Sequence, residues 1–321
     1  MQTYEESKIS FVRSIFRENR RILFLMLSFL LAASFQPQIK IETSPFLSVY
    51  FAGRAGSPKL PASVSAAGTA VSSAGEGLMR AALVDARAVS CSTAEEFGAI
   101  CAEMPESLGV PAKAYADALK QLSPGDIKKF GELDSSKLTA AARQTEEEFR
   151  KNAGLLSNAG KSLGFKQTDS KVRIIFVPSA PAPHAVTYRS FNGPVSVVAV
   201  DSFSGSQLTE SVLHESLHAL DIQNQNEESV IVQLKKSLQG HDVKGSSEAI
   251  HAVIFATAEF WIKKSNPNHK AYGDSGAYNR MSPGGRGVLS TWKDCLSGKI
   301  ERKQALKMIT DSVPTLVIDR K

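Results

Sequence analysis

Two histidines one helical turn apart, with a glutamate beside the first, form the most informative pattern in the sequence. Residues 214–218 read HESLH, an instance of HExxH. In a helix, positions i and i+4 lie on one face, so His214 and His218 can bind one metal ion. A bound Zn²⁺ would lower the pKa of a water molecule at its open position to ~7 and polarise a carbonyl group. Glu215 can reach that water and serve as the general base.

The surroundings of the motif predict a helix that packs against a core. The apolar positions suited to one packed surface are Val212, Leu213, Leu217 and Leu220. Strands are predicted at 172–177 and 195–200, and the second precedes the helix after a short turn. We expect the strand at 195–200 to lie near a cleft, where an extended peptide could add as a strand. The alternative is a chance motif: two buried histidines and a surface glutamate on an amphipathic helix.

With this context, the segment from about 170 to 280 resembles the HExxH zinc metallopeptidases, the zincins. The resemblance does not extend to the chain before residue 170. It implies a zinc cofactor, a peptide or protein substrate, and a third metal ligand downstream that is Glu, His or Asp. The extended metzincin pattern HExxHxxGxxH is absent, because Asp221 replaces its glycine and Asn224 replaces its third histidine.

Three residues are candidates for the third ligand. Glu248 begins an apolar stretch at 246–264, where a carboxylate is costly to bury unless it is paired or binds metal. That stretch also resembles the glutamate-bearing helix of gluzincins and of the MtfA-like and lethal-factor-like zinc peptidases. Glu259 lies eleven residues later on nearly the same helix face, with ion pairing to Lys263 as its alternative role. His269, in a segment loosely similar to the aspzincin signature, is the third candidate.

Four further residues could complete the site. Asp221 resembles the aspartate of the MtfA-like pattern HExxHxLD, and could orient a ligand histidine or cap the helix. His251 lies one turn from Glu248, and is either a stabiliser of the transition state or a core histidine. Tyr272 and Tyr278 could also stabilise the developing oxyanion, a role that Tyr or His commonly fills in zincins.

The chain divides into four predicted parts. Residues 1–34 carry a signal peptide or membrane anchor, and 35–78 form a linker rich in Gly, Ala, Ser and Pro. Residues 79–165 form a helical region, and 166–321 a zincin-like metallopeptidase domain. The expected fold class is α+β, mostly helical, with a small sheet and an HExxH helix.

The N-terminus predicts an extracytoplasmic location, with the body of the protein periplasmic, secreted or membrane-anchored. Arg20 and Arg21 precede the uncharged apolar run 22–33, which is short for a membrane span of ~20 residues and fits the core of a secretory signal. Its positive flank would stay in the cytoplasm. The net charge of +6, without a basic cluster in the body, argues against a nucleic-acid partner.

The sequence leaves open the state of the cysteines and the choice between two functions. Cys91, Cys101 and Cys295 could form a disulfide after export or remain free thiols. The main prediction is a zinc metallopeptidase with Glu215 as general base. The alternative is a non-catalytic zincin-fold protein of the cell envelope that binds a partner, for which a metal site closed to water would be evidence.

Overall fold

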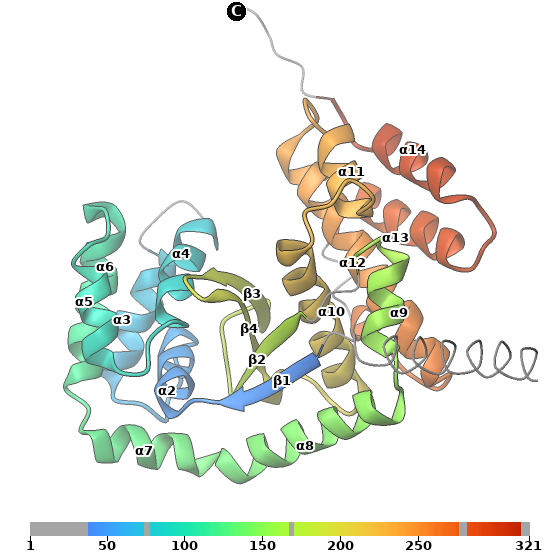
Figure 1. Cartoon of the computed structure of the whole chain (residues 1–321). Coiled ribbons are helices and arrows are strands. Elements are labelled where there is room, and N and C mark those ends of the chain that lie inside the picture. Colours follow the sequence, from blue (N-terminus) through green and yellow to red (C-terminus); the bar gives the residue numbers. More distant parts are fainter. Residues whose placement is uncertain (1–37, 74–77, 167–169, 276–280, 316–321) are drawn as a thin grey trace, which may run out of the picture.

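A computed structural model describes residues 38–73, 78–166, 170–275 and 281–315. In these residues, helices lie on both sides of one four-stranded sheet (Figure 1), which confirms the prediction of a mostly helical α+β chain with a small sheet. The predicted signal or anchor at 1–34 lies outside the described residues. No helix in the described part of the chain is both long and apolar enough to cross a bilayer.

The strands are few and short. They are β1 (Gln38–Thr43), β2 (Lys171–Val177), β3 (Ala185–Ser190) and β4 (Gly193–Ala199). The helices before β2 are α2 (Pro45–Arg54), α3 (Ala62–Ser73), α4 (Leu78–Ala88), α5 (Ala94–Cys101), α6 (Glu106–Lys120), α7 (Pro124–Leu133), α8 (Ser135–Lys151) and α9 (Leu155–Ser162). Those after β4 are α10 (Ser206–Gln223), α11 (Val230–Ser237), α12 (Val243–Ser265), α13 (Pro283–Leu296) and α14 (Arg302–Ser312), with 3₁₀ turns at Val200–Ser202 and Tyr272–Ser275.

The sheet has the order β1-β2-β4-β3, with β3 antiparallel and the other strands parallel. A tight turn at residues 191–192 joins β3 to β4, and Gly193 follows it with φ at 102°, where glycine is favoured. The strand predicted at 195–200 is β4, which pairs on both sides and therefore offers no free edge. A peptide could add only at an outer strand, which corrects the prediction that it adds at 195–200.

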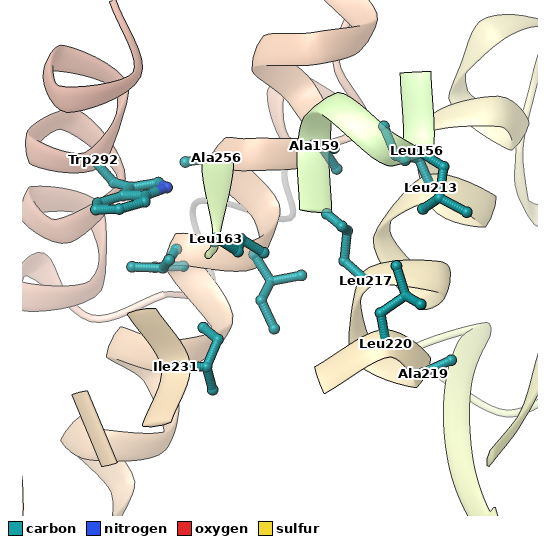
Figure 2. Packing of buried hydrophobic residues seen from close by; sticks show 14 of the residues in the cluster. Leu156, Ala159, Leu163, Leu213, Leu217, Ala219, Leu220, Ile231, Ala256 and Trp292 are labelled. Atoms are coloured by element: carbon teal, nitrogen blue, oxygen red, sulfur yellow. The ribbon is translucent and has the colours of Figure 1, made fainter. Parts of the chain in front are cut away.

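Alternating side chains of the strands face two different cores. Val172, Ile174 and Phe176 of β2 pack with α8 to α14, whereas Ile175 and Val177 pack with α2 to α7. Figure 2 shows part of the first core, in which α10 meets α9. The residues labelled there are Leu156, Ala159, Leu163, Leu213, Leu217, Ala219, Leu220, Ile231, Ala256 and Trp292.

Residues 79–165 are largely helical, as predicted, but the described residues of the predicted linker at 35–78 form regular structure. The predicted linker at 35–78 supplies β1, which pairs with β2 in register from Gln38 and Lys171, and also the buried helix α2. Helices α2 to α7 cover one face of the sheet, and α8 and α9 join the core on the other face (Figure 1). The two predicted parts and the domain at 166–321 therefore share one sheet.

A buried ion pair joins three of these helices. Arg54 Nε of α2 donates to Asp85 Oδ1 of α4 at 2.9 Å, and Arg54 Nη1 donates to the carbonyl of Gly68 in α3 at 2.9 Å. Tyr50 OH also donates to Asp85 Oδ1, at 2.7 Å. The side chains of the pair are only 2% and 7% exposed, so losing one partner leaves a buried charge without compensation.

Replacing Asp85 with alanine is therefore expected to lower the free energy of unfolding by about 3–5 kcal/mol. Urea unfolding of the full chain measures this change. The control is Tyr50→Phe, which removes one hydrogen bond but leaves the ion pair, and is expected to cost about 1.5–3 kcal/mol. A loss below that of Tyr50→Phe in the Asp85→Ala variant would contradict the role given to the pair.

The three cysteines carry free thiols in the structure, so the disulfide that the sequence left open does not form here. Cys91 and Cys101 are buried, and burial raises the pKa of their thiols to about 11 and about 12. They are therefore protonated near neutral pH.

Candidate metal centre

Helix α10 places the HExxH residues between the sheet and helix α12. The helix starts after Gly205, and its Leu213 and Leu217 are fully buried in the core. His214 and Glu215 are each only 4% exposed. Since helical positions 214 and 218 lie on one face, both imidazole rings project toward α12. Their ring centroids are 4.8 Å apart.

A third histidine, His251 of α12, meets the pair from the facing helix. His214 Nε2 lies 3.1 Å from His251 Nε2 and 3.2 Å from His218 Nε2. The ligand atoms of all three rings lie within 4.8 Å of one another. Among the described residues, this is the group of histidine, cysteine and acidic side chains that could hold a metal ion.

The two nitrogen–nitrogen distances from His214 Nε2 fit a tetrahedral metal ion. Zinc binds imidazole nitrogen at about 2.0–2.1 Å, which places neighbouring tetrahedral ligands about 3.3–3.4 Å apart. Both distances from His214 Nε2 are close to that value. One feature differs from a usual ligand histidine, because the buried His214 Nδ1 has no hydrogen-bond partner. Its ring is held instead by packing on Phe255, with centroids 4.0 Å apart.

Burial keeps the three rings in the neutral form that binds metals. It lowers the pKa of His251 to about 4. Burial, with the nearby His251 and Lys235, lowers the pKa of His218 to about 3, and burial beside the other two rings moves the pKa of His214 well below its usual range. At neutral pH each imidazole therefore has a lone pair free for a metal ion.

These shifts make the metal-free protein sensitive to acid. An unfolded imidazole titrates near ~6.5, so below that pH the unfolded chain takes up protons that the folded chain does not, and stability falls. The folded Glu215 carboxyl, with its raised pKa, acts in the opposite direction between pH 7 and ~4.5. Since three imidazoles oppose one carboxyl, the free energy of unfolding is expected to decrease from pH 7 to pH 5.

The His251→Gln variant isolates one imidazole of this effect. Urea unfolding of the metal-free wild type and variant at pH 7 and pH 5 gives the comparison. The decline in unfolding free energy is expected to be smaller in the variant by about 2 kcal/mol. Equal declines in the two proteins would show that the His251 pKa is not lowered in the folded state.

Glu215 has one carboxylate oxygen fixed and the other beside the histidines. Thr187 Oγ1 of β3 donates to Glu215 Oε2 at 2.6 Å, and Ser196 of β4 lies 2.8 Å from the same hydroxyl. Glu215 Oε1 lies 3.8 Å from His214 Nε2. Burial raises the pKa of Glu215 to about 7, and the bond from Thr187 partly offsets this. The carboxylate is therefore oriented with one free oxygen at the cluster.

Glu248, the leading candidate for the third ligand, lies beside the histidine cluster and is not one of its members. Its Oε2 accepts a 3.3 Å hydrogen bond from the backbone N–H of Ser282 at the start of α13. Glu248 and His251 line one cavity of about 210 Å³. The structure thus brings His251, one turn after Glu248 on α12, next to the two histidines of α10.

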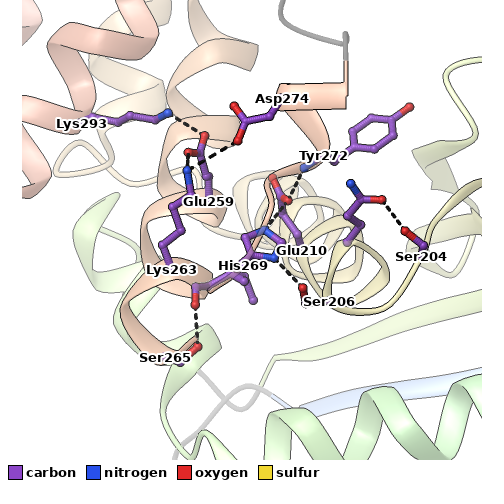
Figure 3. Close-up of polar contacts among 12 residues, drawn as sticks. Ser204, Ser206, Glu210, Glu259, Lys263, Ser265, His269, Tyr272, Asp274 and Lys293 are labelled. Carbon is purple, nitrogen blue, oxygen red and sulfur yellow. Dashed lines mark hydrogen bonds and ion pairs between the residues drawn. The ribbon is translucent and has the colours of Figure 1, made fainter. Parts of the chain in front are cut away.

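The two other ligand candidates have different partners (Figure 3). Glu259 accepts from Lys263 and Lys293, each at 2.6 Å, as the alternative reading of an ion pair with Lys263 suggested. His269 Nε2 lies 2.8 Å from Glu210 Oε2, and its Nδ1 lies 2.7 Å from Ser206 Oγ. Both are tied into networks at the N-terminal end of α10 and the C-terminal end of α12, away from the histidine cluster.

Of the remaining candidates, Asp221 and Tyr272 have partners of their own. Asp221 Oδ2 pairs with Lys235 at 2.8 Å, which anchors α11 to α10. The backbone N–H of Tyr272 donates to Glu210 Oε2 at 2.8 Å, and its ring packs on Phe203 with centroids 4.9 Å apart. Tyr278 lies outside the described residues.

The roles of two residues of the site, His251 and Thr187, could not be assigned from the sequence. The sequence offers His251 as a transition-state stabiliser or a core histidine, and its place one turn after Glu248 does not tell which of the two meets α10. Thr187 gave no signal, because it contacts Glu215 only through the pairing of β3 with β4.

Comparison of the chain with protein-family models, with curated proteins and with solved structures finds no match, so the chemistry of the site follows from its own residues.

Proposed function

We propose that this protein is a zinc-dependent metallopeptidase whose metal ligands are His214, His218 and His251. The observation that carries the proposal is the convergence of three neutral imidazoles on one point, with Glu215 Oε1 beside it. Three nitrogen donors with a fourth position left open is the arrangement of catalytic zinc sites, whereas structural sites are filled by four protein ligands.

The chain's own residues would divide the work as follows. A zinc ion held by the three imidazoles would supply a Lewis acid for a water molecule and a peptide carbonyl. Glu215 Oε1 would accept a proton from the attacking water, and Thr187 holds Oε2 and so fixes the direction of the free oxygen. Leu213 and Leu217 anchor α10 in the core and keep the two histidines from moving apart.

Strand β3 is the favoured place for the peptide substrate. It is an edge strand of the sheet, and its Thr187 contacts Glu215. An extended peptide that pairs with this edge would pass close to the general base. We keep the extracytoplasmic location of the enzyme as part of the proposal, on the strength of the apolar run at 22–33.

The experiment is hydrolysis of an unfolded protein substrate by the full chain, followed by mass spectrometry of the fragments. We expect cleavage that stops when a chelator removes the metal and returns when zinc is added. A protein that binds one zinc ion per chain but cleaves no substrate would contradict the proposal. It would favour the non-catalytic alternative, a partner-binding protein of the cell envelope.

A further inference from the structure

A cavity next to the histidine cluster is not used by the chemistry described above. It is about 210 Å³ in volume, and its lining residues are Ser247, Glu248, His251, Phe255 and Met281. Phe255 stacks on the ring of His251, with centroids 4.8 Å apart and an interplanar angle of 18°, and also packs on His214. His251 is therefore both a wall of the cavity and a member of the cluster, and a group bound in the cavity would lie beside the metal centre.

The walls of this cavity differ in chemistry. Phe255 and Met281 present apolar surface, whereas Glu248 brings a carboxylate. The hydrogen bond from Ser282 N fixes Glu248 Oε2 at the N-terminus of α13, where the helix dipole favours a negative charge.

Glu248 differs from Glu259 and Glu210 in lacking a basic partner. Glu259, on the same helix, is paired with two lysines, and Glu210 is paired with His269. No lysine, arginine or histidine among the residues with a described position forms an ion pair with Glu248. The cavity thus ends in a half-buried negative charge that a ligand could neutralise.

We propose that this cavity receives a substrate side chain adjacent to the scissile bond and that Glu248 selects lysine or arginine there. The apolar stem of such a side chain would lie along Phe255 and Met281, and its cationic end would pair with the carboxylate. This inference rests on the proposed peptidase function and names a substrate class for it. Glu248 is a specificity residue in this account, and neither a metal ligand nor a general base.

The test compares four peptides that differ at one residue, which is lysine, arginine, norleucine or glutamate. One set carries this residue before the cleaved bond, and a second set carries it after the bond. The zinc-loaded full chain is expected to cleave the lysine and arginine peptides with kcat/KM about tenfold above the norleucine peptide. In Glu248→Gln the ratio of lysine to norleucine is expected to fall about tenfold, and in Glu248→Lys the glutamate peptide should become the best of the four.

The matched control is Glu228→Gln, the same change at an exposed carboxylate before α11, and it is expected to leave all ratios unchanged. Cleavage with equal kcat/KM for lysine and norleucine would overturn the inference about the cavity and leave the peptidase function standing. So would an equal loss for all four peptides in Glu248→Gln. No cleavage of any peptide by the zinc-loaded protein would overturn both.

Discussion

Replacing His251 with alanine is expected to abolish stoichiometric zinc binding. The wild type should retain about one zinc ion per chain after dialysis, because three imidazoles and a water complete a tetrahedral site. The variant keeps only His214 and His218, and two protein ligands rarely hold zinc against dialysis. Elemental analysis of the dialysed protein measures the content, and circular dichroism checks that the variant is folded.

The matched variant is Glu248→Ala, since Glu248 is the other residue of α12 that could serve as third ligand. The geometry predicts that this variant keeps its zinc, because Glu248 is hydrogen-bonded to Ser282 and lies outside the cluster. The reverse pattern, with zinc lost in Glu248→Ala and kept in His251→Ala, would show that Glu248 completes the site.

The Glu215→Gln variant is expected to keep its zinc and lose its catalytic activity. Glutamine has the same shape and still accepts the hydrogen bond from Thr187, but it cannot take up the proton of the attacking water. We therefore expect kcat for peptide hydrolysis to fall by about 10²–10⁴-fold, the usual contribution of a general base. Steady-state kinetics on the zinc-loaded variant gives the value.

Thr187→Val separates the chemistry of Glu215 from its orientation. It removes the 2.6 Å hydrogen bond to Oε2 and leaves the carboxylate in place, so its cost in kcat is expected to be smaller, about tenfold. Hydrolysis at the wild-type rate in Glu215→Gln would rule out Glu215 as the general base, whatever the effect of Thr187→Val.

The elements that the sequence predicts best are those whose pattern is set by burial on both faces. β2 and β4 lie in the middle of the sheet and are rich in buried apolar residues, and both were predicted within two residues of their bounds. β1 and β3 lie at the edges, are half-exposed and carry polar residues, so their patterns are weak. For β1, the small and polar residues that follow it also favoured a linker.

The candidate site also has a part that local spacing predicts and a part that only the packing of distant helices brings together. His214, Glu215 and His218 are fixed by local spacing, because a helix brings positions four apart onto one face. The third histidine lies 37 residues after the first, and only the packing of α12 against α10 brings it there. The sequence favoured Glu248 as the third ligand and offered His251 only as a transition-state stabiliser or core histidine. One helical turn separates the two residues, so spacing alone does not say which of them meets α10.

The most direct test of the metal centre is zinc X-ray absorption spectroscopy on the full chain loaded with one equivalent of zinc. The structure predicts three imidazole nitrogens at about 2.0–2.1 Å and one further oxygen from water. A spectrum with two imidazoles and a carboxylate, four protein ligands, or no zinc bound at one equivalent would contradict a three-histidine site with an open position.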